Sequence, residues 1–333
     1  MRIAVVHNAL ETYSALDEQD VLAQADAVTQ ALRELGHKPL RMTCDLNLFR
    51  TQSELRAVGP RMVFNLVESL EGTGRLIHLF PFLLDSMDLP YTGACAEAMM
   101  LTSNKLLAKT LLDGAGLPTP AWTVSGRAYC PGLLHRPREN PRHWIIKSVW
   151  EHASIGLDPE SIVEVSSLRL LDSLMTDRAA SLGGACFAEA FIEGREFNLS
   201  LLDSPDGPQV LPPAEIAFEG YHSNQARIVD YKAKWDDTSY EFHHTPRRFE
   251  FGPEDQGLLE QLRALCLECW NLLGLRGYAR VDFRVDRHDR PWILEINANP
   301  CLSPDAGFAA AVHQAGLTMT DAIGRIIEIS NMD

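Results

Sequence analysis

The sequence lacks any hydrophobic run of the roughly 20 residues that a membrane-spanning helix needs. The longest candidate, LIHLFPFLLDSM, is interrupted by His78, Pro81 and Asp85. The opening MRIAVVHNAL is too short for a signal peptide and is better interpreted as a first strand. We therefore expect no contact with a membrane.

Closely paired cysteines are also scarce. The seven cysteines are scattered, and only Cys266 and Cys269 have CxxC spacing. They lie in a helical pattern, QLRALCLECWNLL, and no second pair completes a zinc site. A chain without a disulfide framework is typical of a reducing compartment, so we expect a cytoplasmic protein.

Positive charge is in deficit, because 30 Lys and Arg face 45 Asp and Glu for a formal net charge of −15. This balance argues against a general surface for nucleic acids or anionic membranes. A small anion such as a nucleotide must then be attracted locally, by a few placed lysines and a metal ion. The length of 333 residues predicts two or three packed units.

Strand and helix patterns alternate over residues 1–95, which predicts a parallel sheet with helices on its faces. No GxGxxG follows the first strand, so a dinucleotide site is not favoured. The next segment, TSNKLLAKTLLDGAGLP, predicts one helix with Ser103 as its cap. Strands and one more helix follow it in a small α+β unit.

The last third combines strands, a long helix and a hairpin. A polar stretch at 219–253 is predicted to be a long loop, and loops of that length are often functional. Pro304 is expected in the first turn of a late helix. His243 and His244 in the loop have no metal-ligand spacing; a solvated loop is favoured over a substrate contact.

The stretch RVDFRVDRHDRPWILEINANP, residues 280–300, predicts two antiparallel strands. Pairing across the turn sets Asp282 opposite Glu295 and Arg280 opposite Asn297, and it continues so that Arg284 faces Ile293. Alternation then gives one polar face and one core face. The expected core face is listed here: Val281, Phe283, Val285, Trp292, Leu294 and Ile296.

Two carboxylates placed opposite one another repel, and a divalent cation between them removes the conflict. Asp282, Glu295 and the Asn297 amide form an all-oxygen ligand set, which suits Mg²⁺ or Mn²⁺. Arg280 adds a fixed positive charge for an anion. The alternative is the solvated outer face of an edge hairpin.

Three lysines strengthen the first interpretation. Lys147 follows an apolar strand and precedes the small residues Ser154 and Gly156, in a loop that can bring backbone N–H groups to phosphate. Lys105 begins a predicted helix, and Lys234 lies in the polar loop. Each one alone is more often a solvated surface lysine.

Eight separated segments, in order, resemble the ATP-grasp ligases and within them D-alanine–D-alanine ligase. They are LPYTG, NKLLAK, GAGLPTPAW, IIKSVWEHASIG, AEAFIEGREFNLS, YKAKW, GYARVDF and LEINANP. The resemblance implies an α/β and α+β protein: an ATP-grasp fold with an N-terminal parallel-sheet domain. The implied units are residues 1–101, a central subdomain at 102–188 and a C-terminal subdomain at 189–333.

The resemblance also implies residue roles. Lys105, Lys147 and Ser154 would contact the ATP phosphates, and Lys147, Lys234 and Arg280 would serve catalysis. Glu189, Phe191 and Ile192 would frame the adenine, with Glu196 on the ribose. Asp282, Glu295 and Asn297 would hold two Mg²⁺ ions. A carboxylate would attack the γ-phosphate to give an acyl phosphate and ADP, and an amine would then displace phosphate.

The sequence departs from this family on the substrate side. Ala153 precedes Ser154 where the family has two serines, Trp235 replaces a tyrosine, and Glu11 lacks its surrounding pattern. Cys301 stands where a glycine is usual. We therefore expect a carboxylate–amine ligase with altered amino-acid specificity, acting on small molecules and forming a homodimer.

Three alternatives stay open at this point. The chain could be a genuine D-alanine–D-alanine ligase of peptidoglycan precursor synthesis. It could catalyse another ATP-grasp reaction, such as carboxylation. It could also bind nucleotide as a sensor or scaffold, without ligation.

Overall fold

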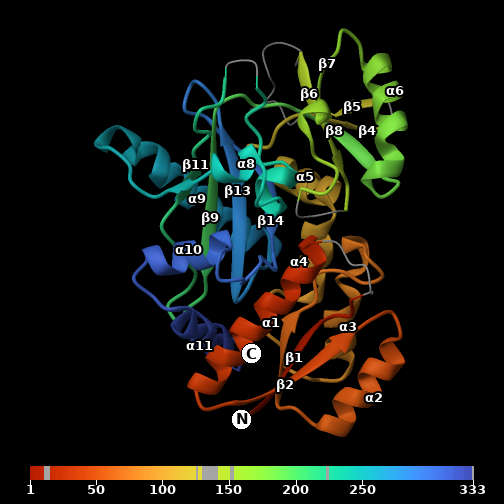
Figure 1. Ribbon diagram of the computed structural model, residues 1–333, viewed down its shortest axis with the longest axis vertical. Helices are drawn as coiled ribbons and strands as arrows, with labels where there is room; N and C mark the ends of the chain where they lie inside the picture. The colour runs from red at the N-terminus through yellow and green to blue at the C-terminus, as the bar shows by residue number, and fades with distance from the viewer. Residues whose placement is uncertain (11–15, 125–126, 130–141, 151–153, 223–224, 332–333) are drawn as a thin grey trace.

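The computed structural model describes residues 1–10, 16–124, 127–129, 142–150, 154–222 and 225–331. Three sheets organise this part of the chain. Figure 1 shows the N-terminal elements in red and orange at the bottom, the central sheet in yellow and green at the top right, and the C-terminal sheet in green, teal and blue beside it. Four short 3₁₀ helices add to the elements below: Gly74–Leu76, Pro159–Ser161, Ala179–Leu182 and Pro253–Asp255.

The N-terminal sheet is parallel, as predicted, with the strand order β2-β1-β3. Its strands are β1 Arg2–Asn8, β2 Lys38–Cys44 and β3 Met62–Leu66, and its helices are α1 Leu16–Glu34, α2 Leu48–Val58 and α3 Leu79–Ser86. Ile3 through Val6 are fully buried, because helices cover both faces of a parallel sheet. Asn8, the last residue of this central strand, lines the site described below.

The central sheet is antiparallel, with the strand order β5-β4-β8-β6-β7. Its strands are β4 Trp122–Val124, β5 Arg127–Tyr129, β6 His143–Ser148, β7 Ile162–Glu164 and β8 Cys186–Ala190. Helix α6, Leu168–Arg178, packs on it through Leu171 and Met175. The sheet presents Lys147 and Glu189 on neighbouring strands.

The helix predicted within residues 102–118 is present as one of two helices here, but its predicted Ser103 cap is wrong. The chain forms α4 Ala96–Ser103 and α5 Lys105–Gly114, which are separated at Asn104. Asn104 has an extended conformation, and its side chain accepts hydrogen bonds from the backbone N–H groups of Leu106 and Leu107. Asparagine is a strong N-cap, so a new helix begins there and Lys105 occupies its first position.

The C-terminal sheet has the order β12-β11-β9-β13-β14, with β10 also paired to β9. Its strands are β9 Arg195–Leu202, β10 Gln209–Val210, β11 Ala214–Ile216, β12 Arg247–Arg248, β13 Tyr278–Val285 and β14 Pro291–Asn297. Its helices are α7 Tyr231–Trp235, α8 Tyr240–His243, α9 Gln256–Leu273, α10 Gly307–Gln314 and α11 Met319–Ser330. The predicted polar loop therefore contains two short helices and the edge strand β12. Pro304 lies before α10, whose cap is Ala306, so its predicted place in the first turn is wrong.

The predicted hairpin register holds only in part. Arg280 pairs with Asn297 and Asp282 with Glu295, but the register then shifts, so that Arg284 pairs with Trp292 rather than Ile293. A β-bulge accommodates one extra residue, Leu294, and turns its side chain out of the core.

The bulge also changes the composition of the core. Ile293 and Ile296 are buried under α9, whereas Trp292 and Leu294 are half-buried, which corrects the predicted core face. Cys266 and Cys269 lie in the same core, on the inner side of α9. The core therefore fixes the outward direction of the polar residues of β13 and β14.

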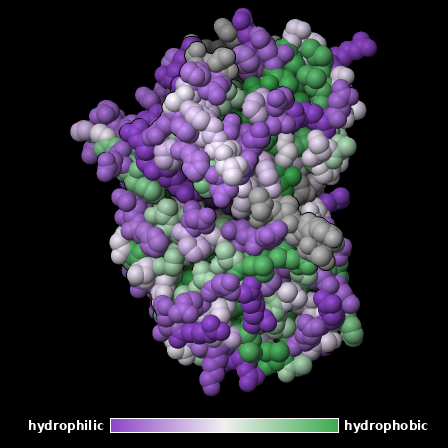
Figure 2. Space-filling model, in the orientation of Figure 1, coloured by the Kyte–Doolittle hydropathy of each residue, from purple (hydrophilic) through white to green (hydrophobic). Residues whose placement is uncertain are grey.

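The two ends of the chain meet. Helix α11 packs against α1, and both termini lie in the lower part of Figure 1. Side chains from α1, β1, α10 and α11 share one hydrophobic core, which includes Ile3, Val28, Phe308 and Ile323. The face seen in Figure 2 is mostly hydrophilic. No helix of the described residues is long and apolar enough to span a membrane.

Candidate active site

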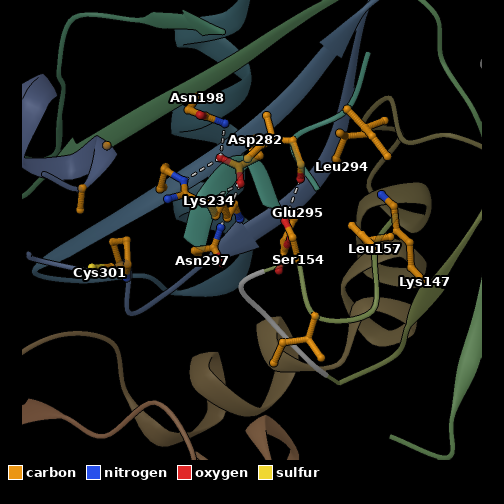
Figure 3. A pocket seen from close by; sticks show the side chains of 18 of the residues that line it. Lys147, Ser154, Leu157, Asn198, Lys234, Asp282, Leu294, Glu295, Asn297 and Cys301 are labelled. Atoms are coloured by element: carbon orange, nitrogen blue, oxygen red, sulfur yellow. Dashed lines mark hydrogen bonds and ion pairs between the residues drawn. The ribbon is translucent and has the colours of Figure 1, made fainter. Parts of the chain in front are cut away.

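A cavity of about 570 Å³ lies between the sheets and draws residues from all of them, from Asn8 to Gly307. Of the twelve residues predicted for the site, all but Lys105 line it. Those eleven are Lys147, Ser154, Glu189, Phe191, Ile192, Glu196, Lys234, Arg280, Asp282, Glu295 and Asn297. Figure 3 shows Asn198, Lys234, Asp282 and Asn297 gathered in the middle, with Lys147 and Cys301 on opposite sides of them.

Asp282 is the centre of the polar cluster. The Nε and Nη2 atoms of Arg280 donate to its two carboxylate oxygens at 2.7 and 2.8 Å. The Asn198 amide, directly opposite on β9, donates at 2.8 Å, and the Asn297 amide donates at 3.2 Å. Burial alone would lower the pKa of Arg280, but Asp282 raises it, so the guanidinium stays charged.

Glu295 forms an ion pair with Lys105, which was predicted to contact the ATP phosphates. Lys105 Nζ lies 3.3 Å from Glu295 Oε1, and the lysine itself is buried behind the cavity wall. The first position of α5 and the Asn104 cap fix this arrangement. Lys105 thus balances one of the two opposed carboxylates, while Arg280 balances the other.

The donor set fits a hard divalent cation. Two carboxylates and an amide supply only oxygen, which suits Mg²⁺ or Mn²⁺ better than zinc. No group of three or more His, Cys, Asp or Glu side chains with metal-binding geometry occurs among the described residues. Ions that keep waters and share substrate phosphate oxygens need no such group.

Lys147 belongs to a buried chain of ion pairs, Lys109–Glu189–Lys147. Strand register sets Ile145 opposite Glu189, so Lys147, two residues further, lies diagonally on the same face. Its Nζ lies 2.8 Å from Glu189 Oε1, and Lys109 Nζ forms an ion pair with the other carboxylate oxygen. Burial would raise the pKa of Glu189, but Lys109 and then Lys147 lower it, and the net shift is downward.

Lys109 is a residue that the sequence interpretation missed. It is fully buried and also donates to the Thr119 hydroxyl at 2.7 Å. The signal was present in NKLLAK, because an i,i+4 spacing places Lys105 and Lys109 on one face of a helix. The apolar neighbours of Lys109 gave no hint of a buried anion beside it.

A second cross-strand ion pair lies beside the predicted adenine segment. Glu196 and Arg284 are direct partners on β9 and β13, with Arg284 Nη2 3.0 Å from Glu196 Oε2. The Arg284 guanidinium lies over the Phe191 and Phe218 rings, at 5.5 and 5.7 Å from their centroids. Burial raises the pKa of Glu196, and Arg284 opposes this shift.

Two segments after β6 and before α7 meet over the cavity. The Ser154 hydroxyl donates to the Val229 carbonyl at 2.8 Å. Lys234 and Trp235, from α7, both line the cavity. Burial lowers the pKa of Lys234, and Arg280 lowers it further, against the pull of Asp282, Glu295 and Glu196. Lys234 therefore lies beside the acid cluster in the cavity.

The far end of the cavity has a different character, which the sequence did not predict. Asp20 and Glu68 line it together with Cys301. The Cys301 thiol donates to Asp20 at 2.9 Å, and Gln24 donates to Glu68 at 2.9 Å. Burial, followed by Glu68 and Asp20, raises the pKa of Cys301 well above its usual range, so the thiol stays protonated.

The family model described as "D-ala D-ala ligase C-terminus" matches residues 111–328, about two thirds of the chain. The chain belongs to the D-alanine–D-alanine ligase family. Its predicted ATP-grasp fold and its predicted class, an ATP-dependent, ADP-forming ligase, are confirmed by this membership.

Relatives extend beyond the matched segment. A D-alanine–D-alanine ligase of Moorella thermoacetica is 30% identical over 319 residues, covering 93% of this chain and 94% of the relative. An uncharacterized protein, y4sG of Sinorhizobium fredii, is 30% identical over 92% of this chain and 87% of its own length. Identities of this size show the family but leave substrate choice open.

Solved structures of the family share the whole fold. D-alanyl-alanine synthetase A of Vibrio cholerae superposes with a TM-score of 0.72 at 14% identity, covering 100% of this chain and 98% of that one. D-alanine–D-alanine ligase of Bacillus anthracis, complexed with ATP, gives 0.68 at 18% identity, covering 100% and 97%.

Several predicted features of this ligase stand apart from the cavity. His243 bonds the Asp237 carbonyl oxygen and His244 stacks on Tyr240, and neither histidine lines the cavity. Lys105 acts on Glu295 from behind the wall. Glu11 and Ala153, two of the noted departures, lie outside the described residues.

Proposed function

We propose that this ligase joins the carboxylate of one amino acid to the amine of another through an acyl phosphate. One observation carries the proposal: Lys147, Lys234 and Arg280 line the same cavity as the Asp282–Glu295–Asn297 cluster. Phosphoryl transfer requires little from a protein beyond positioning and charge compensation. A scaffold that only binds nucleotide does not need this complete set.

The proposal keeps the predicted roles for the nucleotide half of the cavity. Glu189, Phe191 and Ile192 frame the adenine, and Glu196 accepts the ribose hydroxyls. Lys147, with Ser154 close by, contacts the phosphates. Lys105 reaches them only through Glu295, which revises its predicted direct contact.

Asp282, Glu295 and Asn297 would hold two Mg²⁺ ions, with Mn²⁺ as a substitute. Bound there, the ions would neutralise charge on the phosphate oxygens. The protein's own part is to hold both carboxylates in place, which Arg280, Asn198 and Lys105 do.

The reaction has two balanced steps. A donor carboxylate oxygen attacks the γ-phosphorus, the bond to the bridging oxygen breaks, and ADP leaves with the electron pair. The acceptor amine then attacks the acyl carbon, loses a proton and expels inorganic phosphate. Lys234 contacts the phosphoryl group in transfer, and Arg280 stabilises the oxyanion that forms at the carbonyl.

The substrates differ from two D-alanines in this proposal. Trp235 and Cys301 both line the cavity where the family usually has tyrosine and glycine, and they change its shape and polarity. Joining two D-alanines is the second candidate, favoured by the named relatives. A cytoplasmic location and a homodimer complete the proposal.

The test is ADP release from Mg-ATP across D- and L-amino acids, singly and in pairs, with mass spectrometry of the products. Release that depends on a particular pair, with the matching dipeptide mass, supports the proposal and names both substrates. Release with D-alanine alone would select the second candidate. Nucleotide binding without amino-acid-dependent release would contradict both.

A further inference from the structure

Arg247 lies at the cavity by virtue of the edge strand β12. Strand pairing sets Arg247 opposite Ile216 and Arg248 opposite Glu215 on β11. Successive side chains alternate between the faces of a sheet. Ile216 and Arg247 accordingly both line the cavity, whereas Arg248 does not.

The Arg247 side chain lies against the segment that leads into α10. Its Nη1 donates to the Asp305 carbonyl at 3.1 Å, and its Nε would be 3.4 Å from a Cβ built on Gly307. Within the part of the chain that the structure describes, this carbonyl is its only hydrogen-bond acceptor. Most N–H groups of the Arg247 guanidinium are therefore left for a ligand. A guanidinium can bind a carboxylate through two parallel hydrogen bonds.

A second guanidinium shares this end of the cavity. Desolvation lowers the pKa of Arg247, the positive charge of Arg280 lowers it further, and Asp305 and Cys301 oppose the shift. Arg280 is already engaged by Asp282. Two cations within electrostatic range of one another favour an anion beside them.

The position of Arg247 indicates that the anion it would bind is not an ATP phosphate. Arg247 bonds the Asp305 carbonyl and lines the cavity together with Arg280 and Cys301. Cys301 lies on the opposite side of the acid cluster from Lys147 in Figure 3. Arg247 is thus at the substrate end, next to the residue proposed to stabilise the oxyanion.

We propose that Arg247 binds the carboxylate of the acceptor amino acid. The inference rests on the proposed ligation. Arg247 is then a specificity residue: its bond to the carboxylate fixes the acceptor while the amine reaches the acyl carbon beside Arg280.

The test compares one acceptor amino acid with its carboxamide, which lacks the negative charge, in the ADP-release assay. We expect the wild-type enzyme to prefer the free amino acid by about 30-fold in kcat/KM, the size of a charge-assisted hydrogen bond. Arg247→Gln should remove this preference through KM for the acceptor, with KM for ATP unchanged. Arg247→Lys should restore part of it.

Arg248→Gln is the matched control, one residue away on the opposite face, and should behave as wild type. A preference that survives in Arg247→Gln overturns the inference, as does a raised KM for ATP. The wild-type comparison requires no variant, so equal use of amino acid and carboxamide also overturns it. Absence of any acceptor-dependent ADP release in the wild type instead contradicts the ligation itself.

Discussion

Lys109 and Glu189 show how a single buried charge can serve a site that it does not touch. Glu189 lies between two lysines, one fully buried and one at the cavity. If Lys109 were absent, Glu189 would pair with Lys147 alone and its pKa would rise. Lys109 is therefore a positioning residue: it keeps Glu189 ionised and in place, and Glu189 in turn orients Lys147.

Lys109→Met should destabilise the protein by about 3–5 kcal/mol, because it leaves a buried carboxylate without one of its partners. The lowered pKa of Glu189 stabilises the fold above the ordinary glutamate pKa, and this contribution is lost as pH falls through the folded-state pKa. The acid unfolding midpoint should therefore move to higher pH in the variant. Urea titrations between pH 3 and 7 measure both effects; an unchanged acid midpoint would show that the pair does not hold Glu189 ionised.

Glu295→Gln tests the metal cluster at the residue scale. Gln keeps the shape but removes one of the two opposed charges, so kcat should fall by about 100-fold or more while the thermal midpoint stays close to that of the wild type. Steady-state kinetics and thermal denaturation give the two numbers. Glu268→Gln, on the exposed side of α9, is the control and should leave both unchanged. Retained turnover in Glu295→Gln would remove Glu295 from the proposed cluster.

At the scale of elements, the connection between β8 and β9 is the most constrained segment near the site. Gly194 has φ of 143°, and a Cβ there would collide with the Val285 carbonyl oxygen. Arg284 also donates to the Gly194 carbonyl at 3.3 Å. The segment thus joins Phe191 and Ile192 to Glu196, and it has no room for a side chain at position 194.

Gly194→Ala should cost about 1–3 kcal/mol of stability and raise KM for ATP, because the backbone must move away from β13. Gly114→Ala is the control: its Cβ would meet nothing within 4 Å, and alanine in a helix should be neutral or stabilising by up to about 1 kcal/mol. Chemical denaturation measures the stability of both variants, and steady-state kinetics measure their KM for ATP. Equal behaviour of the two variants would contradict the close packing of Gly194.

The hairpin shows what local pattern can and cannot predict. Alternation of polar and apolar residues was sufficient to pair Asp282 with Glu295 and to gather the cluster. It could not reveal the bulge, because the extra residue, Leu294, is as apolar as its neighbours and only three-dimensional packing selects Ile293 for the core. The prediction of Ser103 as the cap was wrong for a related reason. Ser103 and Asn104 are both favourable N-cap residues, and the structure has Asn104 as the cap of α5.

At the scale of the whole molecule, the cavity exists only because the three sheets meet. Residues from Asn8 to Gly307 line it, so its walls come from parts of the chain that are far apart in the sequence. Ordered motifs predicted eleven of these lining residues. Asp20, Glu68 and Arg247 escaped prediction because no motif marks them, and Lys109 escaped because its partner Glu189 is distant in the chain.

A ligand that binds only the folded state stabilises it, by about 2.7 kcal/mol at 100 times its dissociation constant. Mg-ATP should therefore raise the thermal midpoint by about 4 °C or more, measured by differential scanning calorimetry. Lys147→Met should lose most of this rise, while the exposed Lys232→Met should keep it. No rise in the wild type would contradict a nucleotide site at the cavity.

The most direct test of the central claim follows an oxygen atom. The donor amino acid is labelled with oxygen-18 in its carboxylate, turned over with Mg-ATP and the acceptor, and the released phosphate is analysed by mass spectrometry. Transfer through an acyl phosphate predicts one labelled oxygen in each phosphate released, together with ADP. Unlabelled phosphate accompanying dipeptide formation would contradict the acyl phosphate, and label appearing in AMP would show that the carboxylate is activated by adenylation instead.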